Sequence, residues 1–133
     1  MESLLPLLLL ISITSVIGLL LRAKKGVIKK GTRVKISEGE FGGKYGSRLT
    51  ILQFSTTFCS ECRTSKAIVK DVVKDLKEIA YVEVDAESNL DLVRRVDIRS
   101  TPTTIFLDSK GFEIARAKGA PKRDQLIKAI KAI

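Results

Sequence analysis

The fold of this chain is decided by the stretch Leu49-Thr50-Ile51-Leu52-Gln53-Phe54-Ser55-Thr56-Thr57-Phe58-Cys59-Ser60-Glu61-Cys62. Its first six residues favour extended backbone, and they predict a strand over residues 49–54. From Ser60 to Ile79 the apolar residues recur at helical spacing, which predicts a helix with one buried face. Two cysteines three positions apart therefore stand where a strand passes into a helix.

Strands and helices alternate along the rest of the chain. We expect strands at residues 81–85, 103–107 and 112–117, helices at 89–96 and 122–133, and a tight turn at 108–111. Helices between strands imply parallel pairing, and the late hairpin adds an antiparallel edge. The order β-α-β-α-β-β-α thus predicts an α/β fold, in which helices flank a central mixed sheet.

An uncharged run of eighteen residues, Leu4 to Leu21, lies near the N-terminus. A helix of that length spans roughly 27 Å, close to the hydrocarbon thickness of a bilayer. A cleaved signal peptide is the alternative, but no basic group precedes the run and no small-residue cleavage motif follows it. We therefore expect a single-pass transmembrane anchor that attaches the chain to the membrane through residues 4–21.

Three regions follow from these patterns. We expect a transmembrane anchor at residues 1–23, a basic juxtamembrane linker at 24–48 and the folded α/β domain at 49–133. Within the linker, the alternating residues Thr32–Ile36 form a possible edge strand.

The net charge of +9 is concentrated just after the apolar run. Residues 1–35 carry seven basic groups against one acidic group, while seventeen basic and fourteen acidic groups after residue 35 leave only +3. No basic stripe is interleaved with aromatic residues and Trp is absent, so we expect no nucleic-acid partner. All seven basic groups follow the run, so the positive-inside rule predicts a cytoplasmic domain, with the extracytoplasmic side as the alternative. They are Arg22, Lys24, Lys25, Lys29, Lys30, Arg33 and Lys35.

The chain has two cysteines and no histidine. Two cysteines cannot build a disulfide scaffold, and a structural zinc ion needs four ligands, so we expect no metal and no cofactor. Cys59 falls at a helix N-terminus, where unpaired N–H groups and the helix dipole favour a thiolate. Cys62 lies one turn further in. This arrangement predicts dithiol–disulfide exchange with Cys59 as the attacking thiol and Cys62 as the resolving thiol, rather than inert packing or a shared metal site.

From residue 49 onward the chain resembles the thioredoxin family. The resemblance is carried by Phe58-Cys59-Ser60-Glu61-Cys62-Arg63, Val84-Asp85, Arg99-Ser100-Thr101-Pro102-Thr103 and Lys118-Gly119-Ala120. It implies a thioredoxin-like fold and an enzyme that exchanges electrons between protein thiols or disulfides and a further electron donor or acceptor.

The same resemblance implies substrate-binding residues beside the cysteines. Phe58 stands where the family usually has an aromatic residue before the first cysteine. Thr101 and Pro102 match the family's cis-proline element, where the Thr101 backbone would pair with a bound partner chain as a short strand. Gly119 resembles the small residue that lets a partner's backbone approach.

Four positions depart from the family pattern. Gln53 replaces a buried Asp that handles the proton of the second thiol, and Gln cannot take a proton. Tyr81 stands near the place of a buried Lys, and Ser60-Glu61 replaces the usual Gly-Pro between the cysteines. The redox direction is therefore left open, and a membrane-tethered binding module without redox turnover is the alternative function.

Overall fold

The computed structural model describes residues 4–133, and residues 1–3 of the expected anchor lie outside this range. The elements are α1 (Leu4–Ala23), β1 (Ile28–Lys30), α2 (Glu38–Phe41), β2 (Leu49–Ser55), α3 (Ser60–Val73), β3 (Ile79–Asp85), α4 (Leu90–Arg95), β4 (Thr103–Asp108), β5 (Glu113–Lys118) and α5 (Arg123–Ala132). From β2 onward the order is β-α-β-α-β-β-α, which confirms the predicted fold.

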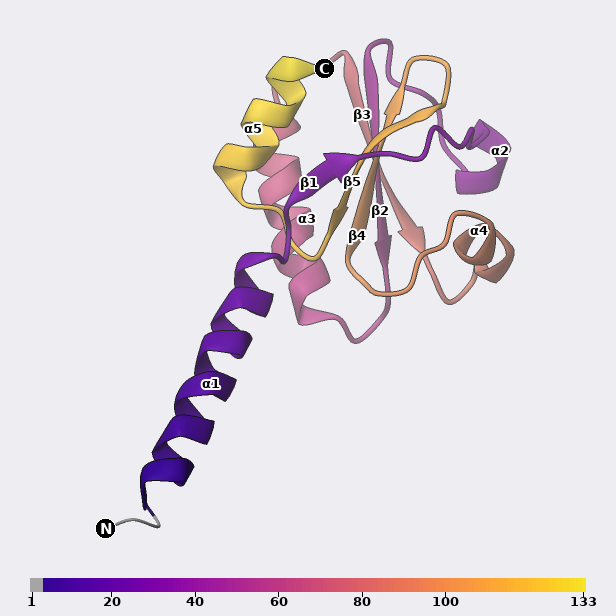
Figure 1. Ribbon diagram of the computed structural model, residues 1–133. Coiled ribbons are helices and arrows are strands. Elements are labelled where there is room, and N and C mark those ends of the chain that lie inside the picture. The colour runs from indigo at the N-terminus through magenta and orange to yellow at the C-terminus, as the bar shows by residue number, and fades with distance from the viewer. Residues whose placement is uncertain (1–3) are drawn as a thin grey trace.

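The sheet has five strands in the order β1-β5-β4-β2-β3 (Figure 1). Strand β2 pairs in parallel with β3 and antiparallel with β4, while β5 pairs antiparallel with both β4 and β1. Every residue of β2 is buried because the strand has neighbours on both sides and helices on both faces. This position explains why residues 49–54 read as a near-continuous apolar run instead of an alternating one.

Helices α3 and α5 cover one face of the sheet, and α4 with the short α2 covers the other (Figure 1). Successive side chains of a strand point to opposite faces, so β2 supplies both cores. Ile51 packs with Val69 of α3 and Leu126 of α5. Leu52 packs on the opposite face with Leu92 of α4. Helix α3 is thereby packed against one face of the sheet, with α4 on the opposite face.

Residues 24–48, expected to be a linker, contribute to both sheet and core. Strand β1 forms one edge of the sheet by pairing with β5. Ile36 is fully buried, and Phe41 of α2 lies in the same apolar cluster as β2 and α4. This segment is therefore built into the folded unit.

The regular edge strand lies just before the segment in which a possible edge strand was expected. The regular strand is Ile28–Lys30, whereas the expected segment, Thr32–Ile36, meets residues 111–113 through single backbone hydrogen bonds and the isolated bridge between Lys35 and Phe112. The physical reason is Arg33, whose φ of 58° is left-handed and interrupts an extended run. An alternating pattern of side chains does not reveal such a backbone reversal.

The helix expected over residues 60–79 is also shorter than its apolar pattern. It ends at Val73, and a turn through Leu76 leads to Ile79, which begins β3 opposite Leu49. The apolar residues after Val73 still face the core, so their spacing continued the helical pattern beyond the helix.

Helix α1 extends away from the domain, and none of its residues is buried by the rest of the described chain (Figure 1). It is long and apolar enough to cross a membrane, a test that an N-terminal signal sequence also passes. The hydroxyls of Ser12 and Thr14 donate to carbonyls one turn earlier in the same helix. These polar groups are thus satisfied without water, as a hydrocarbon environment requires.

Candidate active site

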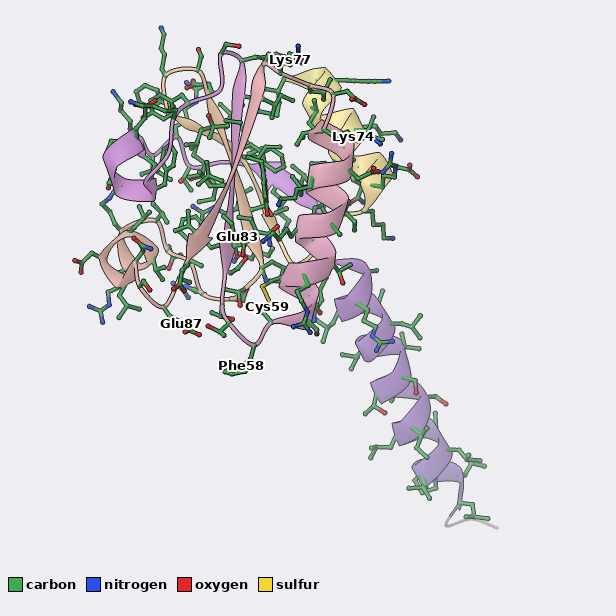
Figure 2. The ribbon with its side chains drawn as sticks, turned by 180° about the vertical axis from the view of Figure 1, so that it is seen from behind. Phe58, Cys59, Lys74, Lys77, Glu83 and Glu87 are labelled. Carbon is green, nitrogen blue, oxygen red and sulfur yellow. A yellow bond between two sulfur atoms is a disulfide. The ribbon has the colours of Figure 1, made fainter. Side chains whose placement is uncertain are left out.

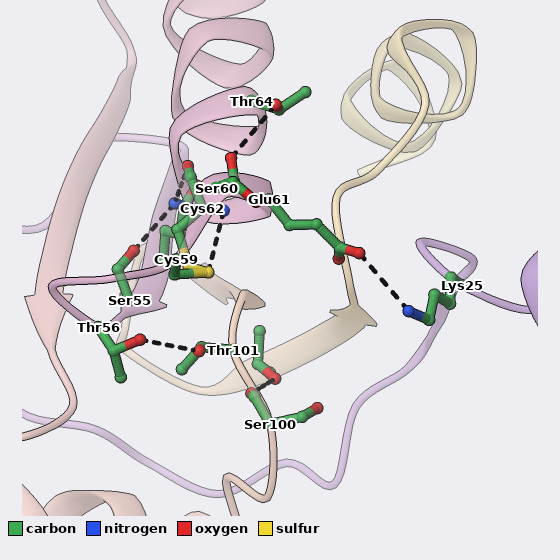
Figure 3. Close-up of a disulfide and its surroundings, with 12 residues drawn as sticks. Lys25, Ser55, Thr56, Cys59, Ser60, Glu61, Cys62, Thr64, Ser100 and Thr101 are labelled. Atoms are coloured by element: carbon green, nitrogen blue, oxygen red, sulfur yellow. Dashed lines mark hydrogen bonds and ion pairs between the residues drawn. A yellow bond between two sulfur atoms is a disulfide. The ribbon is translucent and has the colours of Figure 1, made fainter.

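The two cysteines lie at the start of α3 and form a disulfide (Figure 3). Cys59 is the N-cap of the helix, and the backbone N–H of Cys62 donates to Cys59 Sγ over 3.1 Å. Their Cα atoms are 5.2 Å apart. Cys59 is partly exposed, whereas Cys62 is only 4% exposed. A partner can therefore approach the sulfur of Cys59, and an amide is in place to stabilise negative charge on that sulfur.

The loop that ends in Thr101 and Pro102 lies beside the loop that leads to Cys59. The hydroxyls of Thr56 and Thr101 are 3.3 Å apart (Figure 3). The Thr101–Pro102 bond is cis, as the resemblance implied, and Pro102 is buried. Thus residues far apart in the sequence meet at one end of the sheet.

Gly119 joins this arrangement from the end of β5. Its backbone N–H donates to the carbonyl of Pro102 over 2.7 Å. Its φ of 83° is a conformation that other residues rarely adopt. Glycine at this position is accordingly required by the backbone itself, whatever a partner needs.

Phe58 projects from the loop immediately before Cys59 (Figure 2). Its side chain is 97% exposed, the highest value among the exposed large apolar residues of the described chain. An aromatic ring held in water beside a reactive sulfur is an available contact for a partner.

Gln53 and Tyr81 form a hydrogen-bond network behind the disulfide. The buried Gln53 amide donates to the carbonyl of Cys62 over 2.9 Å and to the hydroxyl of Ser55 over 3.0 Å. The Tyr81 hydroxyl donates to Gln53 Oε1 over 3.3 Å. Burial, and then the charge of Glu83, raise the pKa of Tyr81, so its phenol remains a donor. Neutral groups thus hold the first turn of α3 where the family often has a buried charge.

A cavity of about 400 Å³ opens beside both cysteines. The carboxylates of Glu83 and Asp85 line it, and Glu83 pairs with Lys66 at 2.7 Å. Hydrogen bonds from the Ser88 hydroxyl and then from the Glu87 N–H lower the pKa of Asp85. The sequence reasoning missed Glu83 and Lys66. Glu83 pairs in register with Gln53, so both side chains lie on the sheet face under α3. Aligning the two predicted strands in this register would have placed Glu83 near the cysteines.

Glu61, the acidic residue between the cysteines, has a partner from the start of the chain. Its carboxylate lies 3.5 Å from Lys25 Nζ (Figure 3). Both side chains are more than half exposed, so the pair is weak in energy. It still places the residues that follow α1 next to the cysteines, a contact that the sequence pattern did not predict.

The thioredoxin family model matches residues 34–132. The chain belongs to the thioredoxin family. The match begins before residue 49, in agreement with the buried position of Ile36. Because the chain carries the bonded Cys59–Cys62 pair, this family member is a thiol–disulfide oxidoreductase.

Relatives of known sequence and structure agree with this assignment. Thioredoxin of Ophiophagus hannah is 27% identical over 86 residues, which cover 65% of this chain and 80% of the relative. Among solved structures, thioredoxin-2 of the malaria parasite is 28% identical with a TM-score of 0.59, covering 65% of this chain and 84% of the other. Thioredoxin of Fasciola hepatica is 26% identical with a TM-score of 0.58, covering 65% and 81%.

Proposed function

We propose that this thioredoxin-family chain is tethered to a membrane and exchanges dithiols and disulfides with partner proteins, with Cys59 attacking and Cys62 resolving. The observation that carries the proposal is the difference in exposure between the two sulfurs at the start of α3. The partly exposed sulfur receives the Cys62 N–H and meets the partner first. The buried sulfur of Cys62 is bonded to Cys59 and is far less exposed to a partner.

The exchange balances in two steps. The Cys59 thiolate attacks one sulfur of a partner disulfide, so the partner's S–S bond breaks, a mixed disulfide forms, and the other partner sulfur leaves as a thiolate that takes a proton. The Cys62 thiolate then attacks Cys59 Sγ and releases the first partner sulfur, which is also protonated. Two electrons and two protons have moved to the partner, and the chain holds the Cys59–Cys62 disulfide. The reverse sequence oxidises a partner dithiol.

Four residues form the proposed docking surface for the partner. Strand β4 begins at Thr103, so the backbone of Thr101 lies outside the pairing of the sheet and is available to a partner strand. Pro102 has no N–H that would compete for that strand. Gly119 and the exposed ring of Phe58 flank the same approach to Cys59.

The proposed tether is α1, with residues 4–21 in the bilayer. Its length, its lack of charge and its internally bonded hydroxyls support this assignment. The basic residues after α1 support a cytoplasmic domain, where the thiol pools of that compartment would keep the pair reduced. A C-terminal reporter tests this orientation, and a reporter that is active only outside the cytoplasm would overturn it.

The exchange itself is tested with the full chain in detergent micelles. Reduced protein should open the disulfides of a soluble test protein such as insulin at a rate that depends on added dithiol. The Cys59→Ser variant should lose this rate. Binding of partners without any dithiol-dependent rate would instead support the binding module without redox turnover.

A further inference from the structure

The end of the membrane helix forms part of the active-site surface. A groove of about 210 Å³ is lined on one side by Leu21, Lys24 and Lys25 and on the other by residues that include Glu61, Thr101 and Gly119. We name it the tether groove. Leu21 is the last leucine of α1 and the last residue before the first charged one, Arg22, so the groove begins where the proposed anchor leaves the bilayer.

Three contacts hold the chain after α1 against this site. Lys25 pairs with Glu61, and the N–H of Gly26 donates to the carbonyl of Lys118 over 2.6 Å. A β-carbon added at Gly26 would lie 2.1 Å from the carbonyl oxygen of Ala120, so the two backbones are in direct contact there. Residues 24–26 are therefore packed beside the cysteines and form one side of the groove, which we call the wall. The domain is not joined to α1 by a flexible linker.

This wall fixes which end of the domain faces the membrane. Cys59 and Phe58 lie at the end of the domain toward which α1 extends, and Lys74 and Lys77 lie at the opposite end (Figure 2). A bilayer around α1 is consequently adjacent to the disulfide. A partner disulfide can reach Cys59 most directly if it is itself close to the membrane surface.

The charge of the tether groove indicates the chemistry of its occupant. Lys24, Lys25 and Lys118 line it against the single carboxylate of Glu61, which is already paired with Lys25. The excess positive charge favours a chain segment with acidic side chains. Such a segment would run along the groove to the backbone of Thr101.

We propose that the substrates of this oxidoreductase are membrane-anchored polypeptides whose cysteines lie in an acidic segment just outside the bilayer, with the tether groove as their binding site. This inference rests on the proposed function, since it names the substrate class of the same Cys59–Cys62 exchange. Binding to the same membrane raises the effective concentration of both partners, and the fixed wall adds orientation.

The test uses the reduced full chain in vesicles of neutral phosphatidylcholine. The first probe is a single-span peptide with a disulfide loop just outside the membrane, flanked by acidic residues. The second has lysine flanks instead, and the third is the acidic loop without its span. The wild type should reduce the acidic spanning probe roughly two- to tenfold faster than the lysine-flanked one, as expected for two exposed ion pairs.

Two variants separate groove binding from general tethering. Replacing Lys24 and Lys25 by Gln should abolish the preference for acidic flanks, whereas Lys74→Gln with Lys77→Gln, at the far end, should keep it. A Gly-Ser spacer of about twelve residues after Ala23 reaches only about 20 Å and preserves co-localisation, but it detaches the wall from the anchor. It should slow reduction of the acidic spanning probe severalfold and leave the soluble loop unchanged.

Equal rates for acidic and lysine flanks, or an unchanged rate in the spacer variant, would overturn the inference. A small-molecule disulfide serves as the reference for Cys59 reactivity in every variant. If the wild type reduces neither this compound nor any probe, the proposed function fails. If it reduces the compound and the soluble loop without the preference, only the substrate class is wrong.

Discussion

Removing the amide of Gln53 tests whether neutral hydrogen bonds replace the family's buried charge behind the cysteines. Leu has a similar size and is accommodated by the buried site, but it neither donates nor accepts. The Gln53→Leu variant leaves the Cys62 carbonyl, the Ser55 hydroxyl and the Tyr81 hydroxyl without the partners that they have at 2.9, 3.0 and 3.3 Å.

The magnitude follows from the groups left unpaired. Each buried group that loses its partner costs about 1–3 kcal/mol. Cys62 is nearly inaccessible to water, while Tyr81 is only half-buried, so its hydroxyl recovers part of the loss from solvent. We expect Gln53→Leu to lower the free energy of unfolding by about 2–4 kcal/mol, a large share of a small domain's stability.

Thr104 provides the matched control because it pairs with Gln53 in the sheet register. Its hydroxyl is fully buried and finds no hydrogen-bond partner within residues 4–133. Thr104→Val removes an unsatisfied group at constant shape, so it should be neutral or slightly stabilising. The two substituted residues are neighbours in the sheet. Gln53→Leu should lower the free energy of unfolding, whereas Thr104→Val should leave it unchanged or raise it slightly.

The assay is urea unfolding of the oxidised full chain in detergent, followed by circular dichroism. With a slope of about 1–2 kcal/mol per molar urea, the Gln53→Leu loss moves the midpoint down by about 1–4 M. A midpoint within about 0.3 M of wild type, or an equal loss in Thr104→Val, would refute the view that the amide is a structural support for Cys62.

Three further predictions address the thiols, the proposed anchor and the buried ion pair of β5. Cys62→Ser should accumulate mixed disulfides on Cys59, visible on non-reducing gels, because no second thiol releases the partner; equal trapping by Cys59→Ser would contradict the assigned roles. The full chain should stay in the membrane fraction after alkaline washing, and recovery of a shortened soluble form would revive the signal peptide in place of the anchor. Glu113→Gln should lower the free energy of unfolding by about 2–4 kcal/mol in the same urea assay, because the fully buried Glu113 carboxylate holds the nearly buried Arg116. An unchanged midpoint would contradict this prediction, because it would mean that water hydrates the Arg116 guanidinium as well as the Glu113 carboxylate pairs with it.

The local sequence determined the elements around the cysteines. The apolar run at residues 49–54 and the Cys59–Cys62 spacing were sufficient to predict the buried strand, the helix and the disulfide chemistry, because these depend on neighbours in the chain. The hairpin after residue 103 was predictable for the same reason. The sequence also determined the apolar N-terminal helix and the basic residues that follow it.

The tertiary structure decided what meets the site from a distance. Strand β1 pairs with β5 across almost ninety residues of chain, and the left-handed Arg33 moved that strand away from the alternating pattern. Likewise, Tyr81 meets Gln53 only because β2 and β3 are adjacent. Lys25 reaches Glu61 only because β5 returns the chain to the start of α3. Such contacts depend on sheet register and on loop closure, which no local period in the sequence encodes.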